Sequence, residues 1–434
     1  MARLITRAFA GKRYCISDQT MKAADRILMM VENYFPQDTR VKNEADLLTN
    51  GGYHVSVIAL RTKGQLRRET VDGIEVYRVP HLELFKKTGT AGLSRAALFL
   101  LKLRASLGYL TEYCYFTVAC LLVASYVFVR RGFDVIHAHN PPDTLFVVAI
   151  PFKLLGKKFV FDHHDLCPEL YRSRYKAQEG FYTGLLRLFE WCSLKLADIV
   201  IATNESYKKV ETGRAHKDPR DIFVVRNGPN QRRMTPVAPS VRLRGMNKCI
   251  LCYVGSLNPQ DGVDYLLRSL RYLLCDLKRS DFHCVVMGTG DSLEDLRDLA
   301  ANLQLNGFVE LTGFVSDEDL QANLAAADIC LDPDPSSPLN DVSTWIKVME
   351  YMASAKPIVT FDLKETRFSA RDAAIYVEPN KETEFAQAIA QLMEQPELQK
   401  KMGAYGRRRV EDELQWAKVG KNLLTAYETL LVKK

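Results

Sequence analysis

The sequence lacks several short motifs that identify common enzyme chemistries. It contains no P-loop, no zinc-binding motif and no Ser-His-Asp order of the kind found in serine hydrolases. It also contains no basic segment interleaved with aromatic residues and no known nucleic-acid-binding motif. These absences argue against P-loop nucleotide hydrolysis, triad hydrolysis and zinc chemistry, and we expect no nucleic-acid partner.

The N-terminal segment has no apolar run long enough for the core of a secretory signal. We expect residues 1–25 to be a basic lead-in. The 10 cysteines are scattered, mostly within apolar runs, which predicts buried, reduced thiols in a cytoplasmic protein. Cys249 and Cys252 form a CxxC pattern, but no second Cys or His pair lies nearby, so we expect no metal there.

Charge is unevenly divided along the 434 residues. Residues 1–230 contain 34 Lys+Arg and 23 Asp+Glu, a net charge of +11, whereas the remainder contains 25 and 29, a net charge of −4. The basic half could improve solubility, or it could face an anionic membrane or a phosphorylated acceptor. The length allows two domains of about 200 residues each.

Short apolar, β-branched runs alternate with helix-sized segments throughout the chain. This alternation predicts an α/β fold with parallel sheets and crossover helices. In the first half we expect strands at residues 27–31, 53–60, 74–79, 134–138, 158–161, 199–202 and 222–225. A second unit starts afresh, with strands expected at 249–254, 282–287, 309–311, 329–331 and 358–361.

The two units predict two Rossmann-like domains. We place the first at residues 26–229 and the second at 248–414, with a non-periodic linker at 230–247 and a C-terminal helical segment at 415–434 that contains a helix at 416–431. Two such domains border a ligand cleft at the facing carboxyl ends of their strands.

Residues 96–129 form a long apolar segment whose part 113–129 contains no charged residue. A spanning helix needs about 20 apolar residues. The expected strand 134–138, which must join the first sheet, follows at once. We favour a helix packed on that sheet. A helix lying in the bilayer interface and a spanning helix are the alternatives.

The segment 327–362 carries the most informative pattern. We expect a strand, a loop rich in Pro, Ser, Asn and Asp, a helix at 343–354 and a second strand. Ser343 and Thr344 are candidate N-cap residues. A helix start has unpaired N–H groups and a partial positive charge, which suits a phosphate.

Two charged residues follow within this expected helix. Lys347 lies one turn in, where its ammonium could reach the same phosphate. Glu350, three residues further on, could accept hydrogen bonds from ribose hydroxyls. The alternative is an ordinary amphipathic helix with both side chains in solvent.

The run from Glu350 to Val359, EYMASAKPIV, resembles the donor-site signature of the family 4 glycosyltransferases, which have the GT-B fold. In that family the Glu at this position contacts the nucleotide ribose. Many members have a further Glu where this chain has Val342. The chain resembles instead a bacterial subgroup, acting in surface-polysaccharide assembly, with Ser-Thr-x-x-Lys before the Glu. The resemblance implies two Rossmann-like domains facing a cleft, with the last helix crossing back to the first domain.

Two glycine-containing loops of the second half are further donor candidates. The loop from Gly255 to Gly262 links a strand to a helix, and its small residues let backbone N–H groups approach a pyrophosphate. Related enzymes usually have Arg and Lys where this chain has Ser256 and Asp261, which leaves Lys347 as the most obvious cation for the leaving group. A second loop matches the family's G-x-G-x-x-x-x-L pattern. The predicted donor-binding residues are Gly255, Ser256, Gly262, Gly288, Gly290, Ser343, Thr344, Lys347 and Glu350.

Two histidine-containing runs stand at strand ends in the first half, from Asp134 to Asp143 and from Phe161 to Glu169. They have the composition of a metal site, but the resemblance implies a retaining GT-B enzyme, in which helix dipoles and Lys neutralise the pyrophosphate. We therefore expect no metal and no cofactor. We expect His137 and His163 to be structural and to point to the opposite face. By resemblance, the acceptor-side residues are Asp38, Arg40, His139, Asn140, Asp165 and Glu169, with His164 near the sugar and the acceptor.

Residues 35–41 replace the glycine-rich loop common in the family. Asp38 or Thr39 is predicted to cap the following helix. Arg40 is positioned to bind an anionic acceptor, and a surface role is the alternative.

Together these features predict a retaining glycosyltransferase of the hexosyltransferase type. It would move a sugar from a nucleotide-sugar to a saccharide or polyprenyl-linked saccharide acceptor. The predicted catalytic residues are His164, which orients and polarises, and Lys347 and Glu350. A UDP-sugar 2-epimerase and a non-catalytic GT-B partner protein are the alternatives. We expect a cytoplasmic protein, with contact to the anionic inner face of the cytoplasmic membrane as a further hypothesis.

Overall fold

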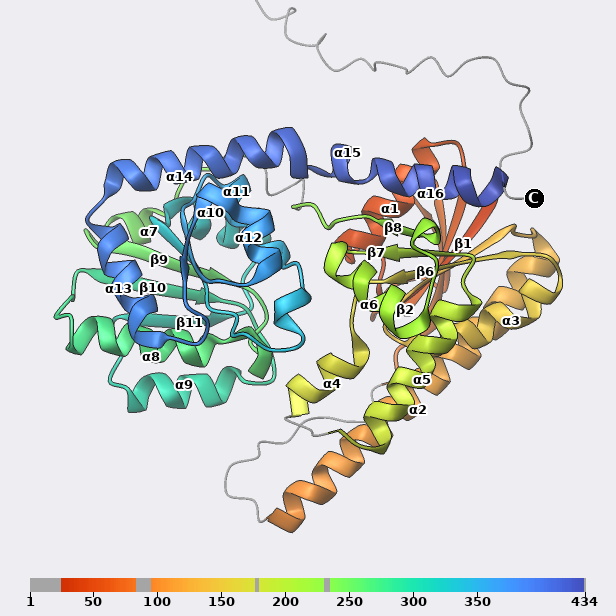
Figure 1. The fold of residues 1–434 in the computed structure, drawn as a ribbon, viewed down its shortest axis with the longest axis horizontal. Helices are drawn as coiled ribbons and strands as arrows, with labels where there is room; N and C mark the ends of the chain where they lie inside the picture. Colours follow the sequence, from red (N-terminus) through yellow and green to blue (C-terminus); the bar gives the residue numbers. More distant parts are fainter. Residues whose placement is uncertain (1–24, 83–94, 176–178, 230–234, 433–434) are drawn as a thin grey trace, which may run out of the picture.

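The computed structural model describes residues 25–82, 95–175, 179–229 and 235–432, with only the backbone for residues 95–107, 109 and 175. Its chain folds into two α/β domains, each built around one sheet (Figure 1). All 12 expected strands are present, with ends that differ from the predicted ones by three residues at most. The predicted α/β architecture of two Rossmann-like domains is therefore confirmed.

The first sheet has the order β3-β4-β2-β1-β5-β6-β7-β8, and only the β3–β4 pair is antiparallel. Its strand order reverses between β1 and β5, so a crevice opens at the carboxyl ends of these strands. The eight strands are β1 (Arg26–Tyr34), β2 (His54–Arg61), β3 (Arg68–Val71), β4 (Ile74–Pro80), β5 (Val135–His139), β6 (Lys158–His163), β7 (Ile199–Ala202) and β8 (Ile222–Val224).

The second sheet is parallel, with the order β11-β10-β9-β12-β13-β14, and reverses between β9 and β12. Helices cover both faces, because its central strands carry apolar side chains on both sides. The six strands are β9 (Cys249–Val254), β10 (Phe282–Met287), β11 (Val309–Gly313), β12 (Ile329–Asp332), β13 (Ile358–Phe361) and β14 (Ala374–Val377). The helices that concern the site here are α8 (Val263–Cys275) and α11 (Ile346–Ala353).

One face of the first sheet packs against a cluster that includes residues of α2 (Arg95–Arg130), α3 (Phe146–Leu154), α5 (Phe181–Leu196) and α6 (Glu205–Ala215). The other face packs against α1 (Thr39–Asn50) and the C-terminal segment. The expected C-terminal helix is divided at Gly420 into α15 (Trp416–Val419) and α16 (Lys421–Val432). This segment follows α14 (Pro396–Arg409) of the second domain and lies against the first sheet (Figure 1).

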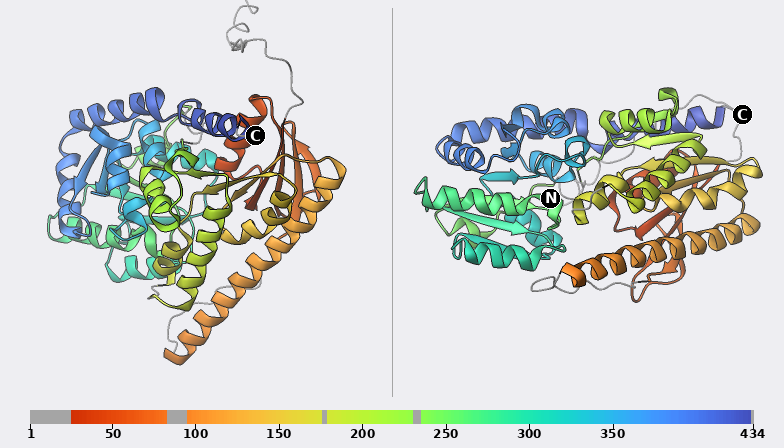
Figure 2. Two further views of the ribbon diagram at one scale, coloured as in Figure 1. Left: turned by 45° about the vertical axis from the view of Figure 1, so that its right-hand side comes forward. Right: turned by 60° about the horizontal axis from the view of Figure 1, so that its bottom comes forward.

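Helix α2 carries apolar side chains both on the face that packs on the sheet and on its exposed face, within its described residues. Phe116, Cys120, Ala124 and Val127 are buried against the sheet, as the favoured prediction requires. The opposite side exposes Val118, Leu122, Tyr126 and Val129. By length and composition alone, the part Leu110–Arg130 could cross a membrane. Its N-terminal end projects beyond the rest of the domain (Figure 2).

A loop of the second domain packs into the core of the first. Leu339 is 3% exposed and belongs to the first domain's hydrophobic cluster, and Val342 packs against the same cluster. Asn204, at the start of α6, donates to the Val342 carbonyl over 2.8 Å and to Thr344 Oγ1 over 2.9 Å. Arg226 forms a further ion pair with Glu365 over 3.0 Å. The two domains are therefore joined by buried contacts as well as by the chain.

Candidate functional site

A large cavity lies between the domains, at the carboxyl ends of the central strands of both sheets. It encloses about 1700 Å³ of empty space, part of it open to solvent. Nine of the predicted residues line it: Asp38, Arg40, His164, Asp165, Gly255, Ser256, Ser343, Thr344 and Lys347. Seven do not: His139, Asn140, Glu169, Gly262, Gly288, Gly290 and Glu350.

Asp38 and Arg40 lie at the start of α1. Asp38 is the N-cap, and its side chain accepts from the Val41 N–H over 3.0 Å, as predicted. Arg40 is only 8% exposed, so the surface role is wrong. Its guanidinium donates to both oxygens of Asp162, over 2.8 and 2.9 Å, and to Asn227 Oδ1 over 2.7 Å. Arg40 therefore serves chiefly as the counter-ion of a buried carboxylate.

Asp162, at the end of β6, organises this side of the cavity, and our sequence analysis did not single it out. Its Oδ2 lies 2.9 Å from His139 Nδ1 and its Oδ1 lies 3.8 Å from His164 Nδ1. Burial by itself would raise the pKa of Asp162. Arg40 and His139 have the larger, opposite effect and hold this pKa well below its usual value, so the carboxylate is charged. Burial acts against the charged form of His164, yet Asp162 raises the pKa of this histidine. His164 can therefore hold a proton at the cavity wall.

Asn140 positions the His164 loop from behind. Its Oδ1 accepts from the backbone N–H groups of His164 and Asp165, over 2.9 and 3.1 Å. Its Nδ2 donates to the Asp165 carbonyl and to Asp143 Oδ1. Because Asn140 is 1% exposed, it cannot contact an acceptor directly.

The predicted orientation of His137 is wrong. We expected it on the face opposite His139, but residues two apart in a strand share a face. The two rings stack with centroids 4.3 Å apart. The contact of His137 agrees with the structural role that we expected for it. Its Nδ1 lies 2.9 Å from the Tyr427 hydroxyl of α16, which ties this helix to the first sheet.

His163 and Glu169 belong to a separate buried network on the other face of the sheet. His163 Nδ1 lies 3.1 Å from Glu211 Oε1, and its Nε2 lies 3.3 Å from Glu190 Oε1. Arg214 bridges Glu190 and Glu169. Glu169 is thus a partner of Arg214 and does not border the cavity, contrary to its predicted acceptor-side position.

One group of described side chains has the composition of a metal site. Ligand atoms of Glu44, His137, His139 and Asp162 all lie within 4.8 Å of one another. Arg40 lies 3.2 Å from Glu44 and pairs with Asp162, so a cation already neutralises these carboxylates and would repel a metal ion. The residues therefore fit a metal poorly, and our expectation that none is needed stays a prediction.

The helix of the donor-side pattern begins later than predicted. Residues 340–342 form a 3₁₀ turn, and α11 starts at Ile346 with Trp345 as its N-cap, without a side-chain capping bond. The proposed capping role of Ser343 and Thr344 is wrong. Ser343 Oγ donates to the Leu339 carbonyl over 2.8 Å, and Thr344 Oγ1 accepts from Asn204. These residues therefore order the loop that leads to the helix.

Lys347 enters the cavity wall from the first turn of α11 and is 7% exposed, so a purely solvent position is wrong. Its Nζ lies 2.7 Å from Asp334 Oδ1, 3.4 Å from Asp332 Oδ1 and 4.9 Å from the centre of the Tyr253 ring. Burial disfavours the ammonium, but Asp334 and its neighbours raise the pKa of Lys347 well above its usual value. Lys347 is therefore charged and held in place at the cavity.

Glu350 and the glycines Gly262 and Gly288 were also predicted to bind the donor, but they do not line the cavity. Glu350 is 5% exposed and lies three residues beyond Lys347, behind the cavity surface as the structure stands. Gly262 and Gly288 have φ values of +67° and +151°. An added Cβ would lie 2.1 Å from the Pro333 carbonyl oxygen at Gly262 and 1.7 Å from the Gly255 carbonyl oxygen at Gly288. These glycines are needed for backbone packing, whatever they contribute to a ligand.

The cavity also includes residues that the sequence analysis missed. Thr203, Tyr207 and Trp345 line it, and Arg174 from α4 (Cys167–Tyr175) reaches it from the first domain. Trp345 occupies an unspecified position of the Ser-Thr-x-x-Lys pattern. No motif points to the other three residues, because only the domain arrangement brings them together.

Comparisons with known proteins agree with this geometry. A family model described as "Glycosyltransferase Family 4" matches residues 37–233, and one described as "Glycosyl transferases group 1" matches residues 248–395. The chain is 26% identical over 241 residues to an uncharacterised glycosyltransferase, MJ1069, of Methanocaldococcus jannaschii, a match that spans 55% of this chain and only 60% of that protein.

Solved structures share the fold. The Anabaena protein Alr3699/HepE, in complex with UDP-glucose, matches with a TM-score of 0.66 at 16% identity, covering 94% of this chain and 99% of that one. WaaG, a glycosyltransferase involved in lipopolysaccharide biosynthesis, matches with a TM-score of 0.65 at 17% identity, covering 91% and 98%. Identities this low show the fold alone. The two family models, which together cover most of the chain, show that it belongs to the family 4 glycosyltransferases and is an enzyme of the GT-B fold.

Proposed function

We propose that the protein is a retaining hexosyltransferase that moves a sugar from a nucleotide-sugar to a lipid-linked saccharide, in the assembly of a surface polysaccharide or glycoconjugate. The observation that carries the proposal is the cavity, whose walls place Lys347 of the second domain opposite His164 of the first. Relatives of the same fold bind UDP-glucose or act in lipopolysaccharide biosynthesis, which supports the donor and acceptor classes.

The chemistry assigned to each wall follows from its charges. The Lys347 ammonium and the N–H groups at the start of α11 would stabilise negative charge on the departing nucleotide phosphate. His164, held by Asp162 and Asn140, would orient the sugar and the acceptor hydroxyl. The resemblance implies retention without a metal, with the leaving phosphate accepting the acceptor's proton, so no side chain need act as a base.

Thermal unfolding with UDP-, GDP-, ADP- and dTDP-sugars in the presence of EDTA tests the donor assignment. A ligand present at about 100 times its dissociation constant should stabilise the protein by about 2.7 kcal/mol. We expect one nucleotide class to give this shift. Glu350→Gln should reduce it, because Glu350 is the residue that the resemblance assigns to the ribose hydroxyls. Nucleoside monophosphates, which lack the sugar to be transferred, are the control.

Product analysis with the donor found in this way then tests the reaction. We expect transfer only when a saccharide acceptor is present, with the anomeric configuration of the donor retained. Conversion of the donor alone would favour an epimerase, and binding without any turnover would favour a non-catalytic protein. An inverted product would contradict the retaining mechanism.

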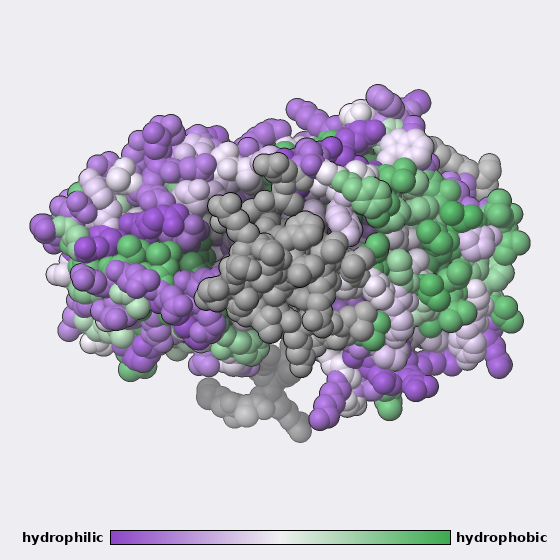
Figure 3. Space-filling view, turned by 90° about the horizontal axis from the view of Figure 1, so that it is seen from below, coloured by the Kyte–Doolittle hydropathy of each residue, from purple (hydrophilic) through white to green (hydrophobic). Residues whose placement is uncertain are grey.

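We further propose that the enzyme works at the inner face of the cytoplasmic membrane, bound through an apolar face of its first domain. Exposed apolar residues of this face lie on α2, on α3 with the residue that follows it, and on α5: Val118, Leu122, Tyr126, Val129, Val147, Ile150, Leu154, Leu155, Phe181, Leu188 and Trp191. Figure 3 shows a broad hydrophobic area on this domain. Arg130 and Arg131 adjoin the face, which suits an anionic bilayer surface.

Flotation with liposomes tests the membrane proposal. The wild-type protein should float with anionic vesicles at low salt, because each large apolar side chain that enters the interface contributes about 1.5–3 kcal/mol. The double variant Leu122→Glu/Val129→Glu should stay in solution. Phe314→Glu, at an apolar residue of the second domain that is 85% exposed, should float like the wild type. A wild-type protein that stays in solution would refute the proposal.

A further inference from the structure

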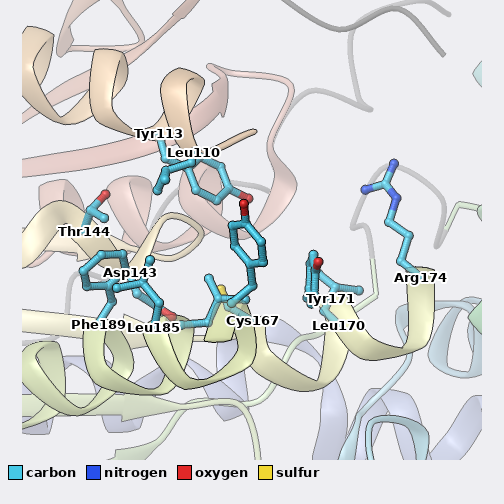
Figure 4. A pocket seen from close by; sticks show the side chains of 12 residues that line it. Leu110, Tyr113, Asp143, Thr144, Cys167, Leu170, Tyr171, Arg174, Leu185 and Phe189 are labelled. Atoms are coloured by element: carbon cyan, nitrogen blue, oxygen red, sulfur yellow. The ribbon is translucent and has the colours of Figure 1, made fainter. Parts of the chain in front are cut away.

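A second groove lies in the first domain, between α2, α4 and α5, beside the cavity described above. It encloses about 820 Å³ of empty space, part of it open to solvent. Most of its walls are apolar or aromatic, with Leu110 and Tyr113 from α2, Leu170 and Tyr171 from α4, and Leu185 and Phe189 from α5 (Figure 4). Its carboxylate, Asp143, is 3% exposed and accepts from Asn140. Such walls suit a hydrocarbon better than a saccharide.

The groove adjoins the cavity between the domains. Leu170 and Arg174 line both spaces. Figure 4 shows Arg174 at one end of the groove and Phe189 and Thr144 at the other. A ligand lying along the groove would therefore have its apolar part among the aromatic side chains and its other end at the site of sugar transfer.

The groove also adjoins the apolar face of the domain. Tyr182 lines the groove, and its neighbour Phe181 is 80% exposed and belongs to the apolar face. The two rings contact each other edge to face, with centroids 5.8 Å apart. A chain leaving the groove beside Tyr182 would thus pass directly onto the surface that we assign to the bilayer.

The charged side chain of Arg174 lies where the groove meets the cavity. Arg174 Nε donates to Asp291 Oδ2 of the second domain over 2.9 Å, and the Arg174 side chain remains 30% exposed. A planar guanidinium is well matched to a phosphate, which could replace or share the Asp291 carboxylate.

From this arrangement we infer that the groove between α2, α4 and α5 binds the isoprenoid chain of a polyprenyl-phosphate-linked acceptor, with its phosphate at Arg174. The inference rests on the lipid-linked acceptor of the proposed function and gives that acceptor a site. The chain would lie along the groove from the apolar face, and the phosphate would place the attached saccharide in the cavity opposite Lys347.

Binding of farnesyl phosphate in detergent-free solution tests the inference, with isopentenyl phosphate and farnesol as probes that lack the long chain and the phosphate. We expect farnesyl phosphate to bind at least about tenfold more tightly than isopentenyl phosphate, a difference of about 1.4 kcal/mol. Leu185→Asp should remove this advantage. Phe314→Asp, at an exposed apolar residue of the second domain outside the groove, should keep it. Arg174→Gln should weaken farnesyl phosphate and leave farnesol unchanged.

A second groove variant distinguishes loss of the binding site from a folding defect in Leu185→Asp. Leu186→Trp narrows the groove with an apolar side chain and should also weaken farnesyl phosphate. Equal affinity for the long and short phosphates, or wild-type affinity in both groove variants, would overturn the inference.

Donor turnover with a soluble saccharide, measured on the same samples, separates the groove assignment from the glycosyltransferase proposal. If turnover persists without farnesyl phosphate binding, the groove assignment fails and the glycosyltransferase proposal stands, whereas absence of all turnover counts against the latter.

Discussion

Lys347→Met should lower kcat about 10²–10³-fold while the protein still folds. The methionine keeps the length and apolar stem of the lysine but removes the ammonium that faces the cavity. Ser256 and Asp261 stand where related enzymes have Arg and Lys, and Asp332, Asp334 and Asp261 add carboxylates to this wall. The loss should therefore exceed the effect of removing one cation among several. Steady-state kinetics with the donor identified by thermal unfolding measure it.

Asp334→Asn is the matched control for this experiment. It keeps the ammonium and removes the carboxylate 2.7 Å away, so we expect it to retain donor binding and most of the turnover. Melting curves of both variants without donor show how much of any loss comes from folding. Turnover in Lys347→Met within a few-fold of the wild type would mean that another group neutralises the leaving phosphate.

His163→Gln should destabilise the protein by about 3–5 kcal/mol near pH 6, because it removes the cation that the buried Glu190 and Glu211 share, and Arg214 pairs with Glu190 but is not paired with Glu211 in the described contacts. Burial lowers the pKa of His163, but its two carboxylate partners raise it to about 10, above the usual 6.5. A group whose pKa is raised on folding contributes stability that is complete below pH 6.5 and is lost as the pH rises towards 10. The cost of the substitution should therefore shrink between about pH 6 and about pH 9.5.

Urea unfolding at the two pH values measures this difference. His54→Gln, at an exposed histidine at the start of β2, is the control and should change stability little at either pH. A cost that stays constant, or grows towards high pH, would show that His163 is uncharged in the folded protein.

The sequence predicts the strands well because buried parallel strands consist of uninterrupted apolar runs. β9 and β10, for example, have the expected bounds. The two strands it misses lie at sheet edges. β3 reads RETV and is not buried, so it lacks an apolar pattern, whereas β14 reads AIYV and was missed although its residues are apolar.

The site is less predictable because its geometry depends on partners distant in the sequence. The motif places Lys347 correctly, but the Asp332 and Asp334 contacts come from a neighbouring strand end. The start of α11 was predicted three residues too early because Ser343 and Thr344, good caps in isolation, are engaged by Leu339 and Asn204. Arg40 was expected to face an acceptor, and only the fold shows that Asp162 is its partner.

The loop that carries Leu339 and Val342 also limits how freely this enzyme can be recombined. These side chains belong to the second domain but pack in the core of the first, and the α15–α16 segment, reached through the second domain, covers the first sheet. A chimera joined at the interdomain linker would bring a foreign loop and a foreign tail to surfaces shaped for these residues. In a functional hybrid, residues 339–342 and 416–432 should therefore come from the same parent as the first domain. The part that can be exchanged is the second domain without these two segments.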